Sequence, residues 1–304
     1  MLFQFNGNKV KQVRENDFKL EKDIQSFVEE NMQELLGLEF IVSEFPINNF
    51  RIDSLAYDKE NNAFMIIEYK RGKNDSLIDQ GYTYLNILFD RKADFVLKYN
   101  ELKNRNLKIN DIDWEQSRVI FISPKFTDYQ IKANDFKNNP IELIQIKKYE
   151  NNIIELDVIK KNSNINLETN LANNEDNVIS NVSKQIKVYT EEDHLENSSE
   201  ELKELYFKIK EMILDWDEIK VDPKKLYIAF KGKNNIADIE LRSKDVKIYL
   251  NLKAGELEDP NNIARDVSNI GHWGNGDYEI KILNDDQLEY IMSLIKQSWK
   301  KNKK

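Results

Sequence analysis

One short segment, residues 63–70 with the sequence AFMIIEYK, constrains the fold more than any other part of the chain. Alternate residues of a strand lie on opposite faces, and here both faces are apolar until Glu68. A continuous apolar run of this kind predicts a central strand that is covered on both sides, in an α/β protein. An unpaired carboxylate at its end would cost on the order of several kcal/mol or change its protonation, so Glu68 requires a partner.

Two partners for Glu68 are suggested by the residues nearby. Lys70 lies on the same face of the strand, about 7 Å further along. Asp53 lies in the next predicted strand, residues 50–57, which would pair with the first through a turn at "DKENN". Two carboxylates that converge beside a lysine form a hard-oxygen site for Mg²⁺ or Mn²⁺. The lysine would then hold the attacking water or stabilise the charge that develops on a phosphate.

Two predicted helices add polar residues to this constellation. In the helix expected over residues 18–36, Glu21 lies close to the apolar stripe, whereas Glu29 and Glu30 project well outside it. In the helix expected over about 76–91, Gln80 lies on the inner side, four residues before Tyr84. A glutamine in that position needs a hydrogen-bonding partner.

These residues resemble the PD-(D/E)XK nucleases of the restriction-endonuclease-like fold, and the helix with Gln80 and Tyr84 is similar to that of RecB-like and NucS-like nucleases. The resemblance covers about residues 15–125, with Ile52 in place of the proline of the nominal motif. It implies that Asp53 and Glu68 bind the metal with help from Glu21, and that Lys70 serves the attacking water. It also implies that Gln80 and Tyr84 contact DNA or order the site.

Five of these six side chains also have a structural interpretation. Glu68 and Lys70 can form an ion pair at a strand end, and such pairs contribute little when they are exposed. Glu21 can be a helix-start carboxylate that interacts with the helix dipole. Gln80 and Tyr84 can be core residues bonded to the backbone. The combination of all six is harder to explain in this way than any single member.

The rest of the chain predicts two domains of mixed α/β class. Residues 1–160 form the nuclease-like domain, a mixed sheet flanked by helices, and a polar stretch over 161–197 is typical of a linker. An Asn-Gly pair at residues 6 and 7 predicts an opening hairpin. The remaining elements of this domain are expected at the following places: strands at 39–45, 94–99, 117–123, 141–147 and 153–159, and a helix near 127–137.

Residues 198–304 are expected to form a smaller α+β domain, in which two helices enclose an antiparallel sheet. This half resembles an uncharacterised C-terminal domain of bacterial proteins catalogued as "predicted transport proteins". Its loop "GHWGNGD" contains His272 and Trp273, which can stack on a base or sugar, or can be structural with the indole in the core. A zinc site is not expected, because the only other histidine is His194.

Composition limits the classes of function. There is no cysteine, no stretch approaches the ~20 apolar residues of a membrane span, and the first residues lack the pattern of a signal peptide. A cytoplasmic protein without a membrane partner is therefore expected. The net charge of −9 argues against non-specific coating of nucleic acid, although a local basic patch can still bind phosphate.

The leading hypothesis is a Mg²⁺- or Mn²⁺-dependent nuclease that hydrolyses phosphodiester bonds, with DNA favoured over RNA and an endonuclease over an exonuclease. The C-terminal domain would supply recognition, regulation or assembly, including a homodimer. One alternative is a nucleic-acid-binding or regulatory protein with little catalysis on the same fold. Another is a protein-interaction scaffold.

Overall fold

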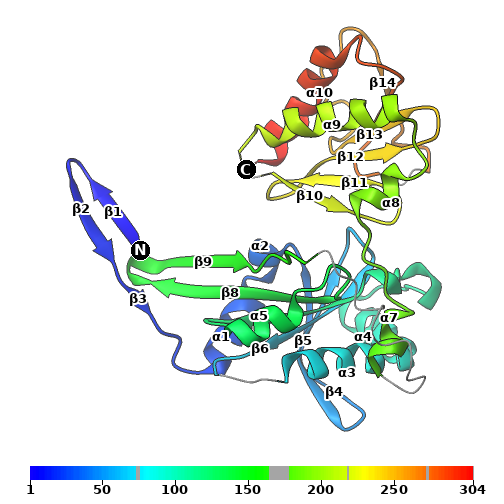
Figure 1. Ribbon diagram of the computed structural model, residues 1–304. Coiled ribbons are helices and arrows are strands. Elements are labelled where there is room, and N and C mark those ends of the chain that lie inside the picture. The colour runs from blue at the N-terminus through cyan, green and yellow to red at the C-terminus, as the bar shows by residue number, and fades with distance from the viewer. Residues whose placement is uncertain (73–75, 164–177, 218, 272–273, 304) are drawn as a thin grey trace. The chain divides into compact units, whose positions relative to one another are not determined.

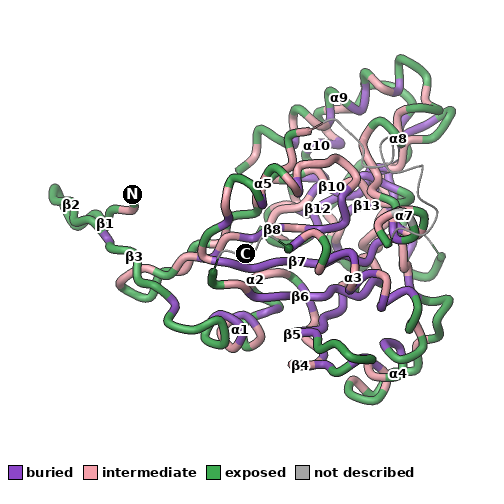
Figure 2. The backbone as a smooth tube through the Cα atoms, turned by 60° about the horizontal axis from the view of Figure 1, so that its bottom comes forward, coloured by how far each residue is buried: buried purple, intermediate pink, exposed green. Residues whose placement is uncertain are grey.

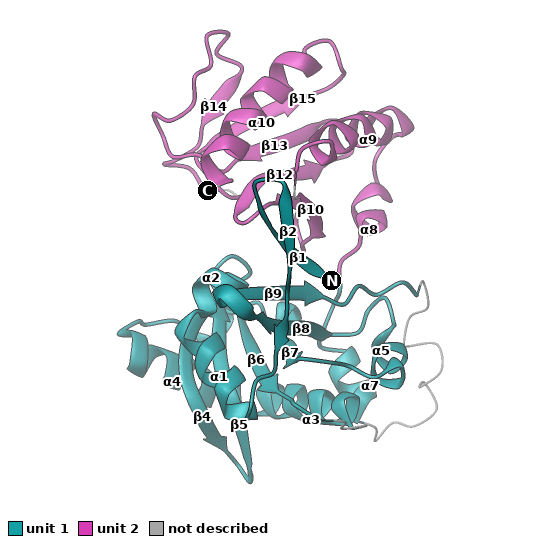
Figure 3. Ribbon diagram, turned by 90° about the vertical axis from the view of Figure 1, so that its left-hand side faces the viewer, with its two compact units in different colours: residues 1–188 teal, residues 189–304 magenta. Residues whose placement is uncertain are grey.

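The computed structural model describes residues 1–72, 76–163, 178–217, 219–271 and 274–303 (Figure 1). The chain divides into two compact units, residues 1–188 and residues 189–304, which are coloured separately in Figure 3. Each unit has its own hydrophobic core. In the described part of the chain, no helix is long and apolar enough to cross a membrane.

The first unit is built on a seven-stranded mixed sheet, as the sequence predicts. Two pairings, β6 with β7 and β7 with β8, are parallel, and the others are antiparallel. The strand order is β3-β8-β7-β6-β5-β4, and β9 pairs with β8 beside this path. The strands are β3 (Glu15–Asn16), β4 (Glu39–Ile47), β5 (Phe50–Asp58), β6 (Ala63–Tyr69), β7 (Arg118–Ser123), β8 (Ile141–Tyr149) and β9 (Ile153–Val158).

Strand β6 is central because both of its faces are covered. Every residue of β6 is buried, and Figure 2 shows the purple buried stretches along β6 and β7. On one face, Phe64 and Ile66 belong to a core shared with α3 (Leu77–Asp90) and α4 (Lys92–Lys103). On the other face, Ile67 belongs to a core shared with α1 (Glu21–Glu30) and α2 (Met32–Leu36). The apolar run therefore has the covering on both sides that its composition predicts.

Smaller elements complete the first unit. The predicted hairpin is present as β1 (Leu2–Asn6) and β2 (Lys9–Val13), with Gly7 at a φ of 60° in the turn. A glycine adopts this left-handed conformation without steric cost. The others are α5 (Asp128–Asn134), α7 (Val178–Ser183) and the 3₁₀ turns η1 (Ile109–Asp111), η2 (Trp114–Gln116) and η3 (Glu150–Asn152).

Two predicted elements differ from the structure. The strand expected over residues 94–99 is wrong, because this stretch belongs to α4. Phe95, Val96 and Tyr99 are buried on one side while Leu97 is exposed, and that spacing fits a helix face. The helix expected over 18–36 is two helices, α1 and α2, because the backbone of Asn31 leaves the helical conformation, with a φ of −121° and a ψ of 18°.

The stretch expected as a linker, residues 161–197, is divided between the units. Residues 164–177 lie outside the described residues. Helix α7 belongs to the first unit, where Val182 and Ile186 are buried in the core that contains α3. Helix α8 (Glu191–Leu195) belongs to the second unit and begins after Thr190, whose hydroxyl accepts a hydrogen bond from the main chain of Asp193. These two short helices were not predicted from the sequence, because the stretch is polar and shows no sustained apolar periodicity.

The second unit contains the expected antiparallel sheet, with strand order β10-β11-β12-β13-β15-β14. Helices α9 (Glu200–Leu214) and α10 (Leu288–Asn302) share one hydrophobic core with the sheet. The strands are β10 (Lys220–Pro223), β11 (Ile228–Lys231), β12 (Asn235–Leu241), β13 (Val246–Leu250), β14 (Ala264–Asp266) and β15 (Tyr278–Ile282). The loop residues His272 and Trp273, singled out in the sequence, lie outside the described residues.

Candidate functional site

The pairing of β5 with β6 brings Asp53 and Glu68 together at one end of the sheet. The two strands are antiparallel and Ser54 lies opposite Ile67. The main-chain N–H of Asp53 donates to Oε1 of Glu68 (3.1 Å). The main-chain N–H of Tyr69 donates to Oδ2 of Asp53 (3.1 Å). Each carboxylate is therefore held by the backbone of the opposite strand.

Three more of the predicted residues surround Glu68. The ammonium group of Lys70 lies 3.3 Å from Oε2 of Glu68, and the amide of Gln80 donates to the same oxygen (2.9 Å). The Gln80 amide is also 3.2 Å from the hydroxyl of Tyr84, which donates in turn to the main-chain oxygen of Arg51 (3.2 Å). Helix α3 thus supplies the partner that the buried carboxylate requires.

Glu21 is the outlying member of the group. It is the first residue of α1 and is exposed, and its Oε2 accepts a hydrogen bond from the main-chain N–H of Arg71 (3.0 Å). Among the described residues, its side chain forms no hydrogen bond with Asp53 or Glu68. Its negative charge nevertheless acts on Asp53, where it contributes to a raised pKa. All six residues predicted from the sequence therefore lie around the adjoining ends of β5 and β6.

Burial and mutual repulsion shape the electrostatics of the two carboxylates. Burial and, to a smaller extent, the charge of Asp53 raise the pKa of Glu68 to about 7, against the opposing effect of Lys70. The pKa of Asp53 is also raised, mainly by burial, against the opposing effects of the Tyr69 N–H and Lys70. A divalent cation between the two groups would offset both burial and repulsion.

Asp53 and Glu68 are the residues of this site that could hold a metal ion, and both supply oxygen ligands. Among the described residues, no cluster of three or more His, Cys, Asp or Glu side chains is arranged to hold a metal ion. Two carboxylates and exposed Glu21 are present instead. Mg²⁺ usually keeps several waters and binds through one or two carboxylates together with substrate phosphate. Asp53 and Glu68 match this mode of binding.

An open pocket of about 410 Å³ lies beside the charged group. Lys70 and Gln80 line it, so it connects the buried centre to solvent. Phe50, which is 45% exposed, packs edge-to-face on Tyr84 at 6.3 Å between ring centroids. Burial, followed by the charge of Glu68, raises the pKa of Tyr84 to about 12, so its hydroxyl remains a neutral donor. The remaining residues that line the pocket are Ser76, Asp79 and Thr83.

A polar network on the opposite face of β5 and β6 was missed in the sequence. The amide of Gln25 donates to the main-chain oxygen of Asp53 (2.8 Å) and to Oε1 of Glu29 (2.9 Å). The hydroxyl of Ser54 donates to the same Glu29 oxygen (2.6 Å) and lies 3.0 Å from the hydroxyl of Tyr69. The network ties α1 to the residues that adjoin both carboxylates.

This network corrects the expectation that Glu29 projects away from the sheet. A helical wheel ranks positions by their apolar neighbours, and it does not reveal a buried hydroxyl such as Ser54 on the facing strand. Ser54 and Tyr69 directly follow Asp53 and Glu68, so they alternate to the other face of the sheet. The polar Ser54 within an apolar strand was the signal available in the sequence. Glu30, by contrast, is exposed as expected.

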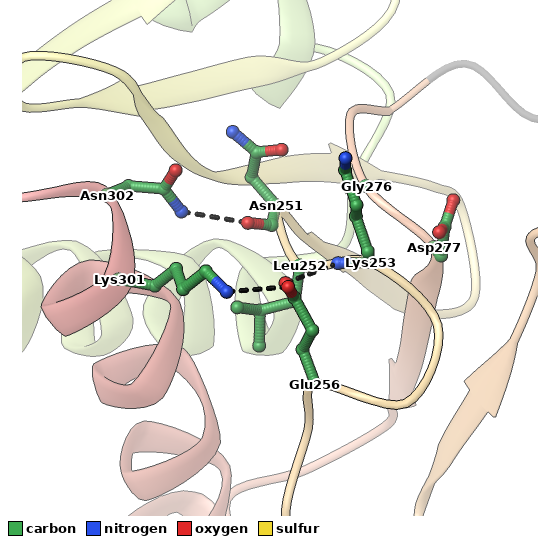
Figure 4. A pocket seen from close by; sticks show the side chains of 8 residues that line it. All are labelled: Asn251, Leu252, Lys253, Glu256, Gly276, Asp277, Lys301 and Asn302. Carbon is green, nitrogen blue, oxygen red and sulfur yellow. Dashed lines mark hydrogen bonds and ion pairs between the residues drawn. The ribbon is translucent and has the colours of Figure 1, made fainter.

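The second unit has a pocket of its own, of about 550 Å³ (Figure 4). Its polar groups bond to one another. Lys301 pairs with Glu256 at 2.6 Å, and the amide of Asn302 donates to the main-chain oxygen of Asn251 (2.8 Å).

Comparisons with known proteins place the chain among uncharacterised relatives. Residues 191–302 match the family described as "Domain of unknown function (DUF5655)". An uncharacterized protein of Haemophilus influenzae is 50% identical over 305 residues, which span 98% of this chain and 99% of that protein. Among solved structures, a repair endonuclease from Pyrococcus abyssi is 22% identical over 40% of this chain and 44% of its own, with a TM-score of 0.22. That score is too low to establish a shared fold.

Proposed function

We propose that this chain, which belongs to the same family as the uncharacterized protein of Haemophilus influenzae, is a metal-dependent nuclease that hydrolyses phosphodiester bonds of DNA. The observation that carries the proposal is the group formed by Asp53, Glu68 and Lys70. Two adjoining strands bring buried Glu68 and half-buried Asp53, both of raised pKa, together beside the amine of Lys70, which lines an open pocket. Strongly perturbed carboxylates in such a position are characteristic of functional sites.

Asp53 and Glu68 would hold Mg²⁺ or Mn²⁺, with Glu21 assisting from the first turn of α1. Bound there, the ion would lower the pKa of a water and neutralise charge on the phosphate. Lys70 is paired with Glu68 and lines the pocket, and its ammonium group would orient the attacking water or stabilise the phosphoryl oxygens. Gln80 and Tyr84 would fix the orientation of Glu68 and contact the nucleic acid.

The second unit would provide target recognition or regulation. Its family has no described function, and its charged pocket groups pair internally. Hydrolysis therefore depends only on residues of the first unit in this proposal. DNA is favoured over RNA, and an endonuclease over an exonuclease, on the resemblance of the motif residues to PD-(D/E)XK nucleases.

The test is cleavage by the purified full chain. Supercoiled plasmid, linear duplex and single-stranded DNA are incubated with Mg²⁺, Mn²⁺ or EDTA, beside the variants Asp53→Ala and Lys70→Ala. Lys98→Ala is the matched control, because Lys98 forms a more exposed ion pair with Glu101. We expect nicking or linearisation that requires metal, survives Lys98→Ala and falls by at least about 100-fold in the two site variants. Cleavage that persists in both site variants would refute this assignment of the centre.

A second candidate function, nucleic-acid binding without catalysis, is favoured by one observation. Both oxygens of Glu68 already accept hydrogen bonds, from the Asp53 main chain on one side and from Lys70 and Gln80 on the other. If this bonding replaces a metal, oligonucleotide binding will persist in EDTA and in both site variants, without any cleavage. Absence of binding at every salt concentration would instead support the interaction scaffold.

A further inference from the structure

Val13 is the only buried residue in the two strands of the N-terminal hairpin, both of which the structure describes. Strands β1 and β2 pair only with each other in the described part of the chain, and they form a separate two-stranded sheet. Phe3 is 51% exposed, Phe5 71% and Val10 67%. A two-stranded hairpin alone is at best marginally stable in water, and three such side chains in solvent leave apolar surface unburied. The hairpin therefore calls for a partner.

The attachment of the hairpin directs it away from its own sheet. The main-chain N–H of Glu150 donates to the carbonyl oxygen of Arg14 (2.9 Å), and the Asn151 amide donates to the Gln4 side chain (2.9 Å). These contacts hold the base of the hairpin at η3, the turn between β8 and β9. From there the hairpin extends outward, away from β9 (Figure 1).

Strand β9 offers an open edge for pairing. Within the described residues it pairs with β8 alone, so its other edge has main-chain groups without a strand partner. Such an edge accepts an additional strand. Ile154 and Leu156 pack toward the core that contains α1, whereas Glu155 and Asp157, on the opposite face, are exposed.

The two faces of the hairpin match the two faces of β9. Phe5 lies opposite Val10 on an apolar face, while Lys9 and Lys11 lie together on the other. The side chains of residues 1–14 include three basic groups and no acidic ones, and those of residues 150–158 include three acidic groups and no basic ones. If the hairpin pairs with β9, the apolar face of the hairpin therefore continues the apolar face of β9, and the lysines lie beside the carboxylates.

We propose that the hairpin of one copy of this chain adds to the β9 edge of a second copy, with β2 beside β9. The exchange is reciprocal, so one two-fold axis relates two equal contacts, as in an isologous dimer. It extends the mixed sheet of each copy, covers Phe5 and Val10, and pairs Lys9 and Lys11 with Glu155 and Asp157. Nucleic acid suits the site less well, because the acidic β9 strand would repel a polyanion. This inference does not depend on the proposed nuclease activity.

A charge exchange tests the pairing by analytical ultracentrifugation of the full chain. We expect a dimer for the wild type. Lys11→Glu and Asp157→Lys each place like charges together, and each should raise the dimer dissociation constant by about tenfold or more. The double variant Lys11→Glu/Asp157→Lys restores opposite charges and should regain most of the lost affinity. A monomeric wild type, or a double variant weaker than both single variants, would overturn the proposal.

Cross-linking gives an independent measurement, because the chain has no cysteine. Lys11→Cys/Asp157→Cys should form a disulfide between two chains on mild oxidation. The control Lys11→Cys/Glu101→Cys, with its second thiol on exposed α4, should not. A disulfide within one chain would overturn the proposal. So would a Lys11→Glu variant that remains dimeric but loses affinity for a fluorescent oligonucleotide, which would assign the hairpin to nucleic acid instead.

Discussion

Glu68 is almost fully buried and lies beside another carboxylate, and both conditions disfavour its ionised form. It is 2% exposed, and Asp53, Lys70 and Gln80 all contact it. Its neighbours act on it with opposite signs, since Asp53 favours the protonated form and Lys70 favours the ionised form. The balance places the pKa close to neutral, and a carboxylate perturbed this strongly is characteristic of functional sites.

Single substitutions should move this pKa in opposite directions. Asp53→Asn removes the neighbouring negative charge, so the pKa of Glu68 should fall from about 7 toward its usual range. Lys70→Met removes the positive charge and should raise it. Titration of the ¹³C-labelled side-chain carboxyl by NMR measures both. Shifts of the same sign in the two variants would contradict the arrangement of charges.

The raised pKa also predicts how stability depends on pH. The folded protein binds the Glu68 proton more tightly than the unfolded chain does. This contribution is fully present below about pH 4.5 and is lost as pH rises through about 7. The free energy of unfolding should therefore fall by about 1 to 3 kcal/mol between pH 5 and pH 8. Urea unfolding at a series of pH values measures it.

Two additions make the pH experiment specific. Glu68→Gln should flatten the dependence, while Glu101→Gln on exposed α4 should leave it unchanged. At pH 8, Mg²⁺ should restore stability to the wild type, and EDTA should reverse the gain, because a bound cation stabilises the ionised pair. A wild type that becomes more stable from pH 5 to pH 8 would show that other groups dominate.

At the level of elements, helix α3 contacts both the candidate site and α7, which lies in the stretch predicted as a linker. Its first turns present Gln80 and Tyr84 to Glu68. Farther round, α3 packs against α7, where Val182 is fully buried in their shared core. Residues 178–188 therefore help to support the helix that positions the site, although their composition is typical of a linker.

A matched pair of substitutions tests this support. Val182→Ala should destabilise the first unit by about 2 kcal/mol, because it removes two buried methyl groups and leaves a cavity. Val178→Ala lies on the same helix at a position that is 39% exposed, and it should have little effect. Denaturant unfolding compares them. Equal stability of the two variants would mean that α7 does not pack on the first unit in solution.

At the scale of the whole molecule, the chain consists of two units with separate cores. Ile66 belongs to a core of the first unit and Ile239 to that of the second. Both are fully buried. Domains with their own cores open as separate cooperative units unless a large apolar interface joins them.

Core substitutions should therefore act on one unit at a time. Ile66→Ala and Ile239→Ala should each cost about 2 to 5 kcal/mol in their own unit, because each creates a cavity. Hydrogen exchange followed by mass spectrometry should show reduced protection only in residues 1–188 for the first and only in residues 189–304 for the second. Loss of protection across both units in either variant would indicate a single cooperative molecule. The Ile239→Ala variant should also retain the proposed nuclease activity.

Local pattern was sufficient for the parts of the fold that local chemistry governs. Neighbouring residues were enough to predict three features: the continuous apolar run of β6, the Asn-Gly turn of the hairpin, and the alternation of charges around Asp53 and Glu68. The prediction of a strand over residues 94–99, which belong to α4, was wrong for the same reason, since six residues with four apolar side chains fit either period.

The sequence by itself determined which residues carry charge into a buried sheet, because strand periodicity makes an apolar run with a terminal carboxylate conspicuous at short range. Only the tertiary structure decided which distant groups meet it: Gln80 beside Glu68, Glu29 beside Ser54, and α7 against α3. Those contacts join residues far apart in the chain, and polar partners of this kind leave no periodic signal. Burial, and with it the raised pKa of the carboxylates, exists only once the elements have packed.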